Sequence, residues 1–402
     1  MSISQKIESF MERSSWIRKM FEEGLQLKRQ YGAENVFDLS LGNPVMEPPR
    51  ELRETLVAMA GDETPGMHRY MPNAGFADVR RAIARSLTAE CKVELGEDDI
   101  VMACGAAGGM NIALKTLLNP GDEILVLSPY FVEYLFYADN HGGKAVPVAT
   151  DDRFLPDLQA LAVAMTDKTR AVVINSPNNP TGVVYPRQTL QDLAVLLREK
   201  SERAGQAIYL IADDPYKKIV FDGVEAPNIF EFYDHSIYVT SHSKDLAVPG
   251  ERIGFVAVHP RCEDAKALMA GLIFCNRVLG FVNAPALMQR TIKDLQAVRI
   301  DVEPYKRKRD FLYEALTRIG YQVVKPQGAF YMFPRSPLED EVEFCRLLAA
   351  KKVLVVPGRG FGLSGFFRLA YCFPDEVIEG SIPGFAAAFQ EAGKRGQQAP
   401  ET

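Results

Sequence analysis

The chain has 402 residues, of which 47% are hydrophobic, and a formal net charge of −6. This length predicts a large hydrophobic core and two domains. The negative charge and the lack of a long basic tract argue against a general nucleic-acid binder, and the one basic run, residues 306–309, indicates a solvated helix face.

The cysteines and the hydropathy pattern indicate in which cellular compartment the protein is expected. The six cysteines are scattered without a Cys-x-x-Cys pair, which favours free thiols over a disulfide framework or a zinc site. Residues 1–10 are polar, and no run reaches the ~18 apolar residues that span a membrane. We therefore expect a cytoplasmic protein that does not insert into membranes.

A helical N-terminal segment leads to a turn at Gly42, where the backbone can approach a ligand closely because glycine has no Cβ. An ordinary loop glycine is the alternative. After the segment 70–75, short apolar runs alternate with helical patterns. The runs are residues 100–102, 124–127, 171–174, 208–211, 237–240 and 253–258. This alternation predicts an α/β fold with a mostly parallel sheet covered by helices on both faces.

Polar or glycine-rich stretches follow five of these predicted strands. In chain order they contain Gly105, Phe131, Asn179, Asp213 and Lys244. Ligands of open α/β sheets bind beyond the carboxyl ends of the strands, so we expect these five residues at one edge of the sheet.

Beyond residue 285 the pattern changes to long helical segments, which are interrupted at Pro304 and end at Gly320. Short apolar runs and a polar tail after Gln390 follow, and we expect this tail to be frayed. The pattern predicts a smaller α+β unit packed with the N-terminal segment. The expected domains are residues 46–290 (large) and residues 1–45 with 291–402 (small).

The most informative stretch surrounds Lys244. A lysine after a strand can form a Schiff base with an aldehyde cofactor, and Ser241 and Arg252 can bind the phosphate of that cofactor. Taken alone, a lysine such as Lys244 is far more often a solvated surface group, so the case for a cofactor depends on the other residues that converge on it. Glycines 105–109 at the head of a helix can bind an anion, although close packing is the alternative.

Other residues meet the remaining demands of such a cofactor. Asp213 can keep a ring nitrogen protonated; an Asp213–Asp214 metal pair is the alternative, but chain neighbours point to opposite faces and no histidine cluster supports a metal. Asn179 and Tyr216 can donate to a phenolic oxygen, and Phe131 can cover the ring. A buried Arg368 needs an anion, which a substrate carboxylate supplies.

These residues resemble the class I/II aminotransferases of the aspartate aminotransferase superfamily, the fold-type I pyridoxal-phosphate enzymes. The resemblance extends from Gly42 to Arg368. Its most specific motifs are Ser-x-Ser-Lys followed by Gly-x-Arg-x-Gly around Lys244, the Asn-Pro-Thr-Gly sequence at Asn179, and Asp-x-x-Tyr at Asp213.

The resemblance implies roles for individual residues. Lys244 is the Schiff-base lysine and base, and Asp213 and Tyr216 are the other catalytic residues. Gly42, Asn179 and Arg368 bind the substrate. The cofactor pyridoxal 5′-phosphate (PLP) contacts Tyr70, Ala106, Ala107, Gly108, Phe131, Asn179, Asp213, Tyr216, Ser241, Ser243, Lys244 and Arg252. Tyr70 acts in the partner subunit, so a homodimer with shared active sites is implied.

Two positions depart from the family pattern. Many relatives have a serine or threonine where this chain has Ala106-Ala107, so one side-chain donor to the phosphate is missing. His242 occupies a position that is often aromatic, and we interpret it as a packing residue.

The expected reaction is amino-group transfer between an L-amino acid and a 2-oxo acid by a ping-pong mechanism, as in aspartate aminotransferase. A PLP-dependent C–S β-lyase or decarboxylase on the same fold is the alternative. A dinucleotide-dependent oxidoreductase would need a complete glycine fingerprint, which residues 358–362 lack, and a ligand sensor would need an added DNA-binding module.

The substrate side chain stays open. A distal carboxylate needs a positive group, for which the candidates are Arg18, Lys19 and Arg277. A pocket for apolar or aromatic side chains would instead use Trp16, Ile17, Tyr70 and Phe131.

Overall fold

A seven-stranded sheet organises the larger part of the molecule. The computed structural model describes residues 3–13 and 16–398, without the side chains of residues 12, 13, 17–19, 21 and 396–398. The strand order is β2-β8-β7-β6-β5-β3-β4. The strands are β2 (Ile100–Ala103), β3 (Glu123–Ser128), β4 (Lys144–Ala149), β5 (Thr169–Ile174), β6 (Tyr209–Asp213), β7 (Ser236–Ser241) and β8 (Gly254–Val258).

The sheet is mostly parallel. The pairs β3–β4, β3–β5, β5–β6 and β6–β7 are parallel, whereas β8 is antiparallel to both β7 and β2. The carboxyl ends of β3, β5, β6 and β7 therefore meet at one edge, and the polar stretches that follow these strands share that edge.

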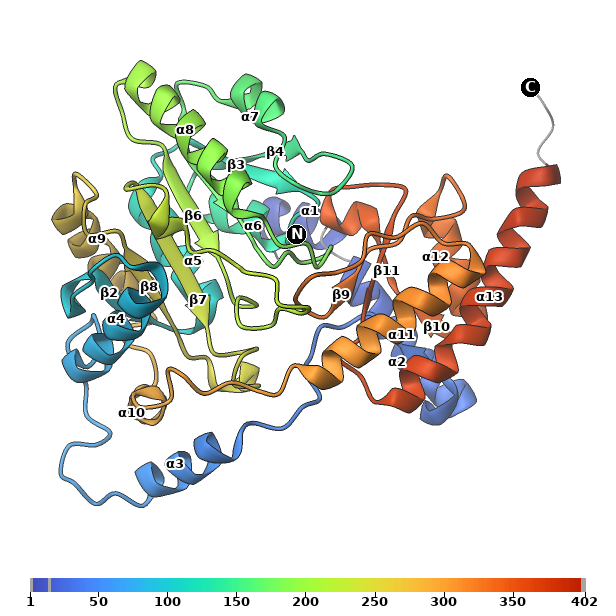
Figure 1. Ribbon diagram of the computed structural model, residues 1–402, viewed down its shortest axis with the longest axis horizontal. Helices are drawn as coiled ribbons and strands as arrows, with labels where there is room; N and C mark the ends of the chain where they lie inside the picture. The colour runs from blue at the N-terminus through green and yellow to red at the C-terminus, as the bar shows by residue number, and fades with distance from the viewer. Residues whose placement is uncertain (1–2, 14–15, 399–402) are drawn as a thin grey trace.

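Successive strand residues pack into two different hydrophobic cores. In β6, Leu210 and Ala212 belong to one core and Tyr209 and Ile211 to the other. Helices α4 (Ala77–Cys91), α7 (Leu158–Ala164) and α8 (Arg187–Ala204) complete the first core. Helices α5 (Gly105–Leu117), α6 (Glu133–Asn140) and α9 (Ala265–Val278) complete the second. The sheet is thus covered on both faces (Figure 1), which confirms the predicted fold class.

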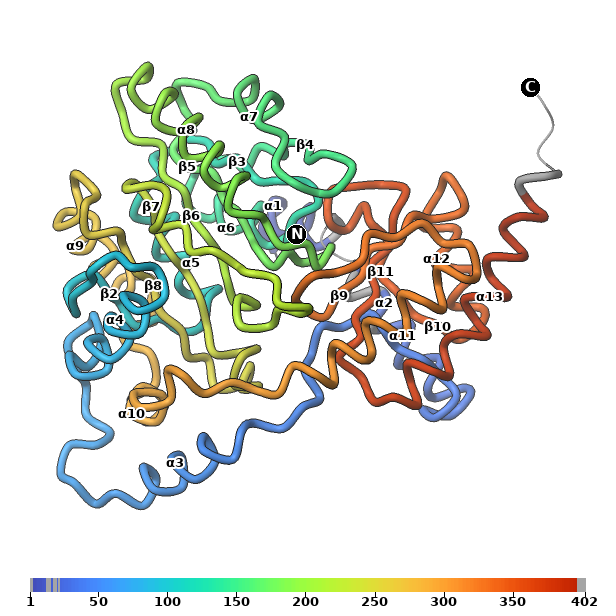
Figure 2. Tube along the Cα trace, in the orientation of Figure 1, coloured from blue at the N-terminus to red at the C-terminus, as the bar shows by residue number. Residues whose placement is uncertain are grey.

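A second unit is built from both ends of the chain. Its three-stranded antiparallel sheet has the order β11-β12-β9, and β1 pairs with β10 in parallel. Figure 2 shows the blue N-terminal segment beside the orange and red C-terminal elements. The elements are α2 (Trp16–Tyr31), β1 (Phe37–Asp38), α11 (Glu303–Ile319), β9 (Tyr331–Met332), α12 (Glu341–Ala350), β10 (Val353–Leu354), β11 (Val356–Pro357), β12 (Phe367–Ala370) and α13 (Asp375–Gln398). Helix α1 (Gln5–Arg13) instead packs on α6, where the ring centres of Phe10 and Phe136 lie 4.9 Å apart. The domain limits given above stay a prediction.

Two further helices contribute Leu52, Met288 and Ile292 to the first core of the large sheet. Helix α3 (Arg50–Ala60) packs against α10 (Ala286–Ile292). None of the described helices combines the length and the apolar character that a membrane crossing requires.

The expected interruption of the helical segments at Pro304 agrees with the structure: α10 ends at Ile292, and Pro304 lies in the first turn of α11, where its missing N–H costs no hydrogen bond. Two other expectations for the C-terminal part were wrong. In the basic run, Arg309 is 1% exposed and ion-pairs with Asp222 at 2.8 Å, so it belongs to the interior. The tail continues as α13 to residue 398 because the buried side chain of Ala392 packs this helix against the core of the second unit.

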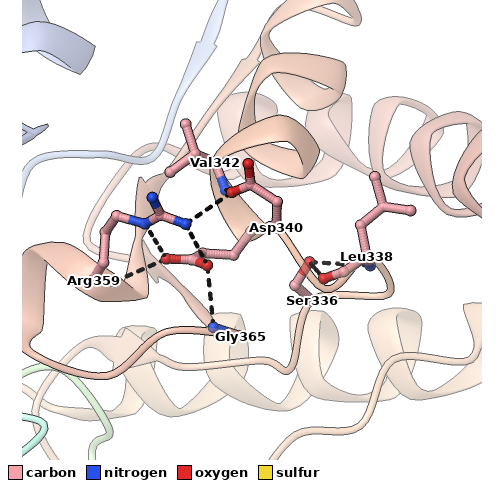
Figure 3. A network of polar contacts seen from close by, with 7 residues as sticks. Ser336, Leu338, Asp340, Val342, Arg359 and Gly365 are labelled. Atoms are coloured by element: carbon pink, nitrogen blue, oxygen red, sulfur yellow. Dashed lines mark hydrogen bonds and ion pairs between the residues drawn. The ribbon is translucent and has the colours of Figure 1, made fainter.

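The glycine-rich segment 358–362 has a structural explanation. It forms a 3₁₀ turn, Gly358–Phe361, whose Arg359 Nε donates to Glu341 Oε1 at 2.8 Å. Figure 3 shows the Arg359 side chain reaching toward Asp340 and the Gly365 N–H pointing into the same network. These hydrogen bonds hold the segment against the first turn of α12. A dinucleotide site would require an α-helix to begin at this segment, and none does.

Candidate active site

The predicted site residues meet in one cavity at the carboxyl edge of the large sheet. Those that line it are Gly42, Ala106, Ala107, Phe131, Asn179, Asp213, Tyr216, Ser241, Ser243, Lys244, Arg252 and Arg368. They come from both units, since Gly42 and Arg368 belong to the smaller one.

Two predicted residues lie outside the cavity lining. Gly108 is buried in the first turns of α5, and a Cβ there would lie 3.3 Å from Cys104 Cβ. Tyr70 is 91% exposed, in the segment between α3 and α4. Its assignment to a partner subunit stays a prediction.

Lys244 projects into the cavity just after β7. Its Nζ donates a hydrogen bond to the Gly42 carbonyl at 3.2 Å and lies 5.6 Å from the centre of the Phe330 ring. Burial lowers the pKa of Lys244 from 10.5 to about 8, with help from the charges of Arg252 and Arg368 and against an opposing effect of Cys372. A neutral amine is therefore accessible near neutral pH.

Asp213 ends β6 and is buried. Its Oδ2 accepts a hydrogen bond from Tyr134 Oη at 2.7 Å, whereas its Oδ1 is buried without a hydrogen-bond partner among the described residues. Burial raises the pKa of Asp213 to about 6, and the Tyr134 hydrogen bond opposes this rise. An unpartnered buried carboxylate oxygen beside a cavity fits a ligand that brings an N–H donor.

Asp214 does not reach this cavity. It lines a different one with Lys217 on the other side of the strand ends, as the alternation of neighbouring side chains predicts. Within the described part of the chain, no group of three or more histidine, cysteine, aspartate or glutamate side chains could hold a metal ion.

The start of α5 and Arg252 form the cationic end of the cavity. The helix begins at Gly105, and its first N–H groups have no acceptor within the helix. Gly105 has φ +70°, and a Cβ there would lie 2.6 Å from Arg252 Nη2, so glycine is required for this close approach. Ser241 Oγ donates to Ser243 Oγ at 3.1 Å. These donors and the helix dipole together suit a phosphate.

Arg368 is buried on β12. Its Nη1 donates to Asn179 Oδ1 at 3.1 Å and its Nη2 to the Ser40 carbonyl at 2.5 Å. The guanidinium lies 4.7 Å from the centre of the Tyr331 ring, and its Nε has no hydrogen-bond partner in the described structure. No ion pair involving Arg368 occurs among the described residues, so a bound carboxylate would complete the site.

The backbone of Gly42 also lies close to a neighbouring side chain, that of Tyr331. A Cβ at Gly42 would lie 1.8 Å from Tyr331 Oη, which is itself 3.0 Å from Tyr216 Oη. A side chain at position 42 would therefore require Tyr331 to move, and the role of Gly42 in substrate binding stays a prediction.

Several lining residues escaped the sequence analysis. They are Glu133, Tyr134, Tyr137, Asn175 and Tyr331. Glu133 and Tyr134 begin α6 shortly after β3 and Phe131, and Tyr137 follows one turn later. That i, i+3 and i, i+4 spacing on a helix that follows a strand was the available signal.

Among the candidates for side-chain selectivity whose side chains the structure describes, Phe131 lines the cavity, whereas Trp16, Tyr70 and Arg277 do not. Arg277 is an exposed residue of α9 that lies over the Phe274 ring. Trp16 lines a separate apolar cavity with Phe10 and Phe136. The side chains of Ile17, Arg18 and Lys19 lie outside the described residues.

Comparisons with known proteins agree on one family. The model of the family described as "Aminotransferase class I and II" matches residues 34–381. A "Probable aspartate/prephenate aminotransferase" of Thermus aquaticus is 31% identical over 395 residues, 96% of this chain and 99% of that protein. The "Aspartate/prephenate aminotransferase" of Thermus thermophilus is 32% identical over 378 residues, 92% and 94% of the two chains.

Solved structures are similar over the whole fold. The structure of an amino transferase from Eubacterium rectale has a TM-score of 0.94 and 37% identity, and the match covers 97% of this chain and 99% of that one. The Thermus thermophilus aspartate aminotransferase with maleate has a TM-score of 0.85 and 28% identity, with 96% and 100% covered.

Proposed function

The chain belongs to the aminotransferase class I and II family, a family of PLP enzymes, and on this premise we propose that it binds PLP at Lys244 and moves amino groups between an L-amino acid and a 2-oxo acid. The observation that carries the proposal is the cavity in which Lys244 and the unpartnered Oδ1 of Asp213 occur together.

The lining residues fit PLP group by group. Asp213 Oδ1 would accept a hydrogen bond from the ring nitrogen, and Tyr216 and the Asn179 amide would donate to the phenolic oxygen. The first turn of α5, with Ala106, Ala107 and Gly108, would bind the phosphate together with the side chains of Ser241, Ser243 and Arg252. Phe131 would cover the ring. When bound, PLP supplies the electron sink for the charge that develops at the substrate Cα.

The residues of the chain supply binding, orientation and proton transfer. Arg368 would hold the substrate carboxylate with its planar fork, and its bond to Asn179 fixes the orientation of that fork. Lys244 Nζ, with its lowered pKa, would take the proton from the substrate Cα. The buried setting of both groups strengthens these charge interactions.

A homodimer with shared active sites is part of the proposal. The support within this chain is that Tyr70 is almost fully exposed and lies away from its own cavity, as expected of a side chain that serves a partner subunit. Sedimentation of wild type, and cofactor affinity of a Tyr70→Ala variant, would test this: a monomer with unchanged affinity contradicts it.

The experiment that tests the function is an assay with a set of amino acids and 2-oxo acids, followed by product identification. We expect a new amino acid whose formation requires both substrates. Ammonia and pyruvate without need of an acceptor would identify a C–S β-lyase, and release of carbon dioxide a decarboxylase; either would overturn the proposal. Lys244→Ala should abolish the reaction, whereas Lys266→Ala, at an exposed lysine of α9, should not.

A further inference from the structure

The charged residues of the cavity are not all accounted for by the proposed function. Among the described residues, the charged side chains that line it are Glu133, Asp213, Lys244, Arg252 and Arg368. The ring nitrogen, the covalent link, the phosphate and the substrate carboxylate engage four of them. Glu133 is left over.

Glu133 is held at the cavity by the fold. It is the first residue of α6, and Tyr137, one turn further on the same face, lines the cavity too. Tyr134, between them, donates to Asp213 and so fixes the start of α6 against β6. The Glu133 carboxyl group is therefore a fixed part of the cavity lining.

One oxygen of the Glu133 carboxyl group lacks a hydrogen-bond partner. Its Oε2 is buried without a hydrogen-bond partner, and no cation lies within ion-pair distance of it in the described part of the chain. Burial raises the pKa of Glu133, and this rise is opposed first by the hydrogen bond from its own backbone N–H and then by the positive charge of Arg368, which lines the same cavity. A buried acceptor in this situation is satisfied by a donor from a ligand.

The substrate is the remaining source of such a donor. With its α-carboxylate on Arg368 and its amino group directed to Lys244, its side chain must share the rest of the cavity with Glu133. A second carboxylate there would meet a like charge at low dielectric, which is strongly unfavourable. A side chain that ends in an N–H or O–H group would instead satisfy the glutamate.

We propose that Glu133 determines substrate specificity by favouring amino acids whose side chains end in a hydrogen-bond donor over those that end in a carboxylate. The inference rests on the proposed function and leaves the reaction itself unchanged. It concerns only the side chain of the amino acid and of the corresponding 2-oxo acid.

The test uses amino acids that differ only in this group. The half-reaction of the holoenzyme is followed by the absorbance of the cofactor, with asparagine against aspartate and glutamine against glutamate. Wild type should prefer the amide in each pair. Glu133→Gln, which removes the charge at constant shape, should shift the ratio of kcat/KM toward the carboxylate by about tenfold or more.

A binding measurement accompanies the kinetics. Titration calorimetry of the holoenzyme with succinamate and with succinate, which differ by an amide and a carboxylate, should show the same shift in the ratio of Kd values. Glu94→Gln, at an exposed glutamate away from the cavity, is the matched control and should leave both ratios unchanged. Glu133→Ala provides a second variant if Glu133→Gln does not fold.

The outcomes separate this inference from the proposed function. A wild type that prefers aspartate and glutamate, or variants that leave the ratios unchanged, would overturn the role of Glu133 while transamination stands. If no amino acid, alanine included, converts the cofactor, the proposed function fails and the inference fails with it.

Discussion

Replacing Lys244 by methionine should stabilise the cofactor-free protein at neutral pH. Burial holds the pKa of Lys244 at about 8 instead of 10.5, so the folded state bears the cost of an enclosed ammonium group. One pKa unit corresponds to about 1.4 kcal/mol, and the full interval therefore to roughly 3 kcal/mol. Water that enters the cavity screens part of this charge, so we expect a gain of about 1 to 3 kcal/mol.

The stability of the wild type should depend on pH in a direction that follows from the lowered pKa of Lys244. Below pH 8 the lysine is protonated in both folded and unfolded states, and the cost is complete. Between about pH 8 and 10.5 the folded protein has released the proton that the unfolded chain still binds, so wild-type stability rises with pH. The advantage of Lys244→Met should therefore shrink over that interval.

Urea unfolding at fixed protein concentration provides the measurement, at pH 7 and at half-unit steps from pH 8 to 9.5. Lys266→Met, at an exposed lysine, is the control and should show neither the gain nor its pH dependence. The reasoning is refuted if Lys244→Met is no more stable than wild type at pH 7, or if its advantage does not change with pH.

Three further substitutions test other parts of the site. Arg368→Lys should lower kcat/KM for the amino acid about 100-fold, because the planar fork is lost, with the cofactor still bound; a loss below threefold would contradict the role of Arg368. Gly42→Ala should lower stability by about 1 to 3 kcal/mol in thermal unfolding, since its Cβ would meet Tyr331 Oη at 1.8 Å; an unchanged Tm would show that the tyrosine moves freely. Asp213→Asn should reduce kcat at least about 100-fold in steady-state assays while the protein stays folded, and near-normal turnover would exclude the carboxylate.

The fold and the position of the site were accessible from the sequence because they depend on local patterns. Short apolar runs followed by polar residues, as at Asp213 and Lys244, mark both a buried strand and its carboxyl end. The motifs around Lys244 and Asn179 then indicated the family, and the predictions of family and of aminotransferase activity are confirmed. The roles of the individual residues stay predictions.

What was missed depends on how helices are oriented in three dimensions. Glu133 and Tyr137 face the cavity because of the rotation of α6 over the sheet, which the packing of its buried Tyr134 and Ala138 sets. Arg309 was predicted to be solvated because it belongs to a basic run on a helix whose apolar residues were expected on the other side, but its guanidinium lies over the Phe221 ring and ion-pairs with Asp222. Such partners are far apart in the sequence, and no local pattern identifies them.

The most direct test of the account is reduction of the purified holoprotein with borohydride, followed by digestion and peptide mapping. Covalent attachment of the cofactor at one buried amine is the claim on which the proposed chemistry rests. We predict a single phosphopyridoxyl group on the peptide that contains Lys244. A label on another lysine, or no label at all, would contradict the account.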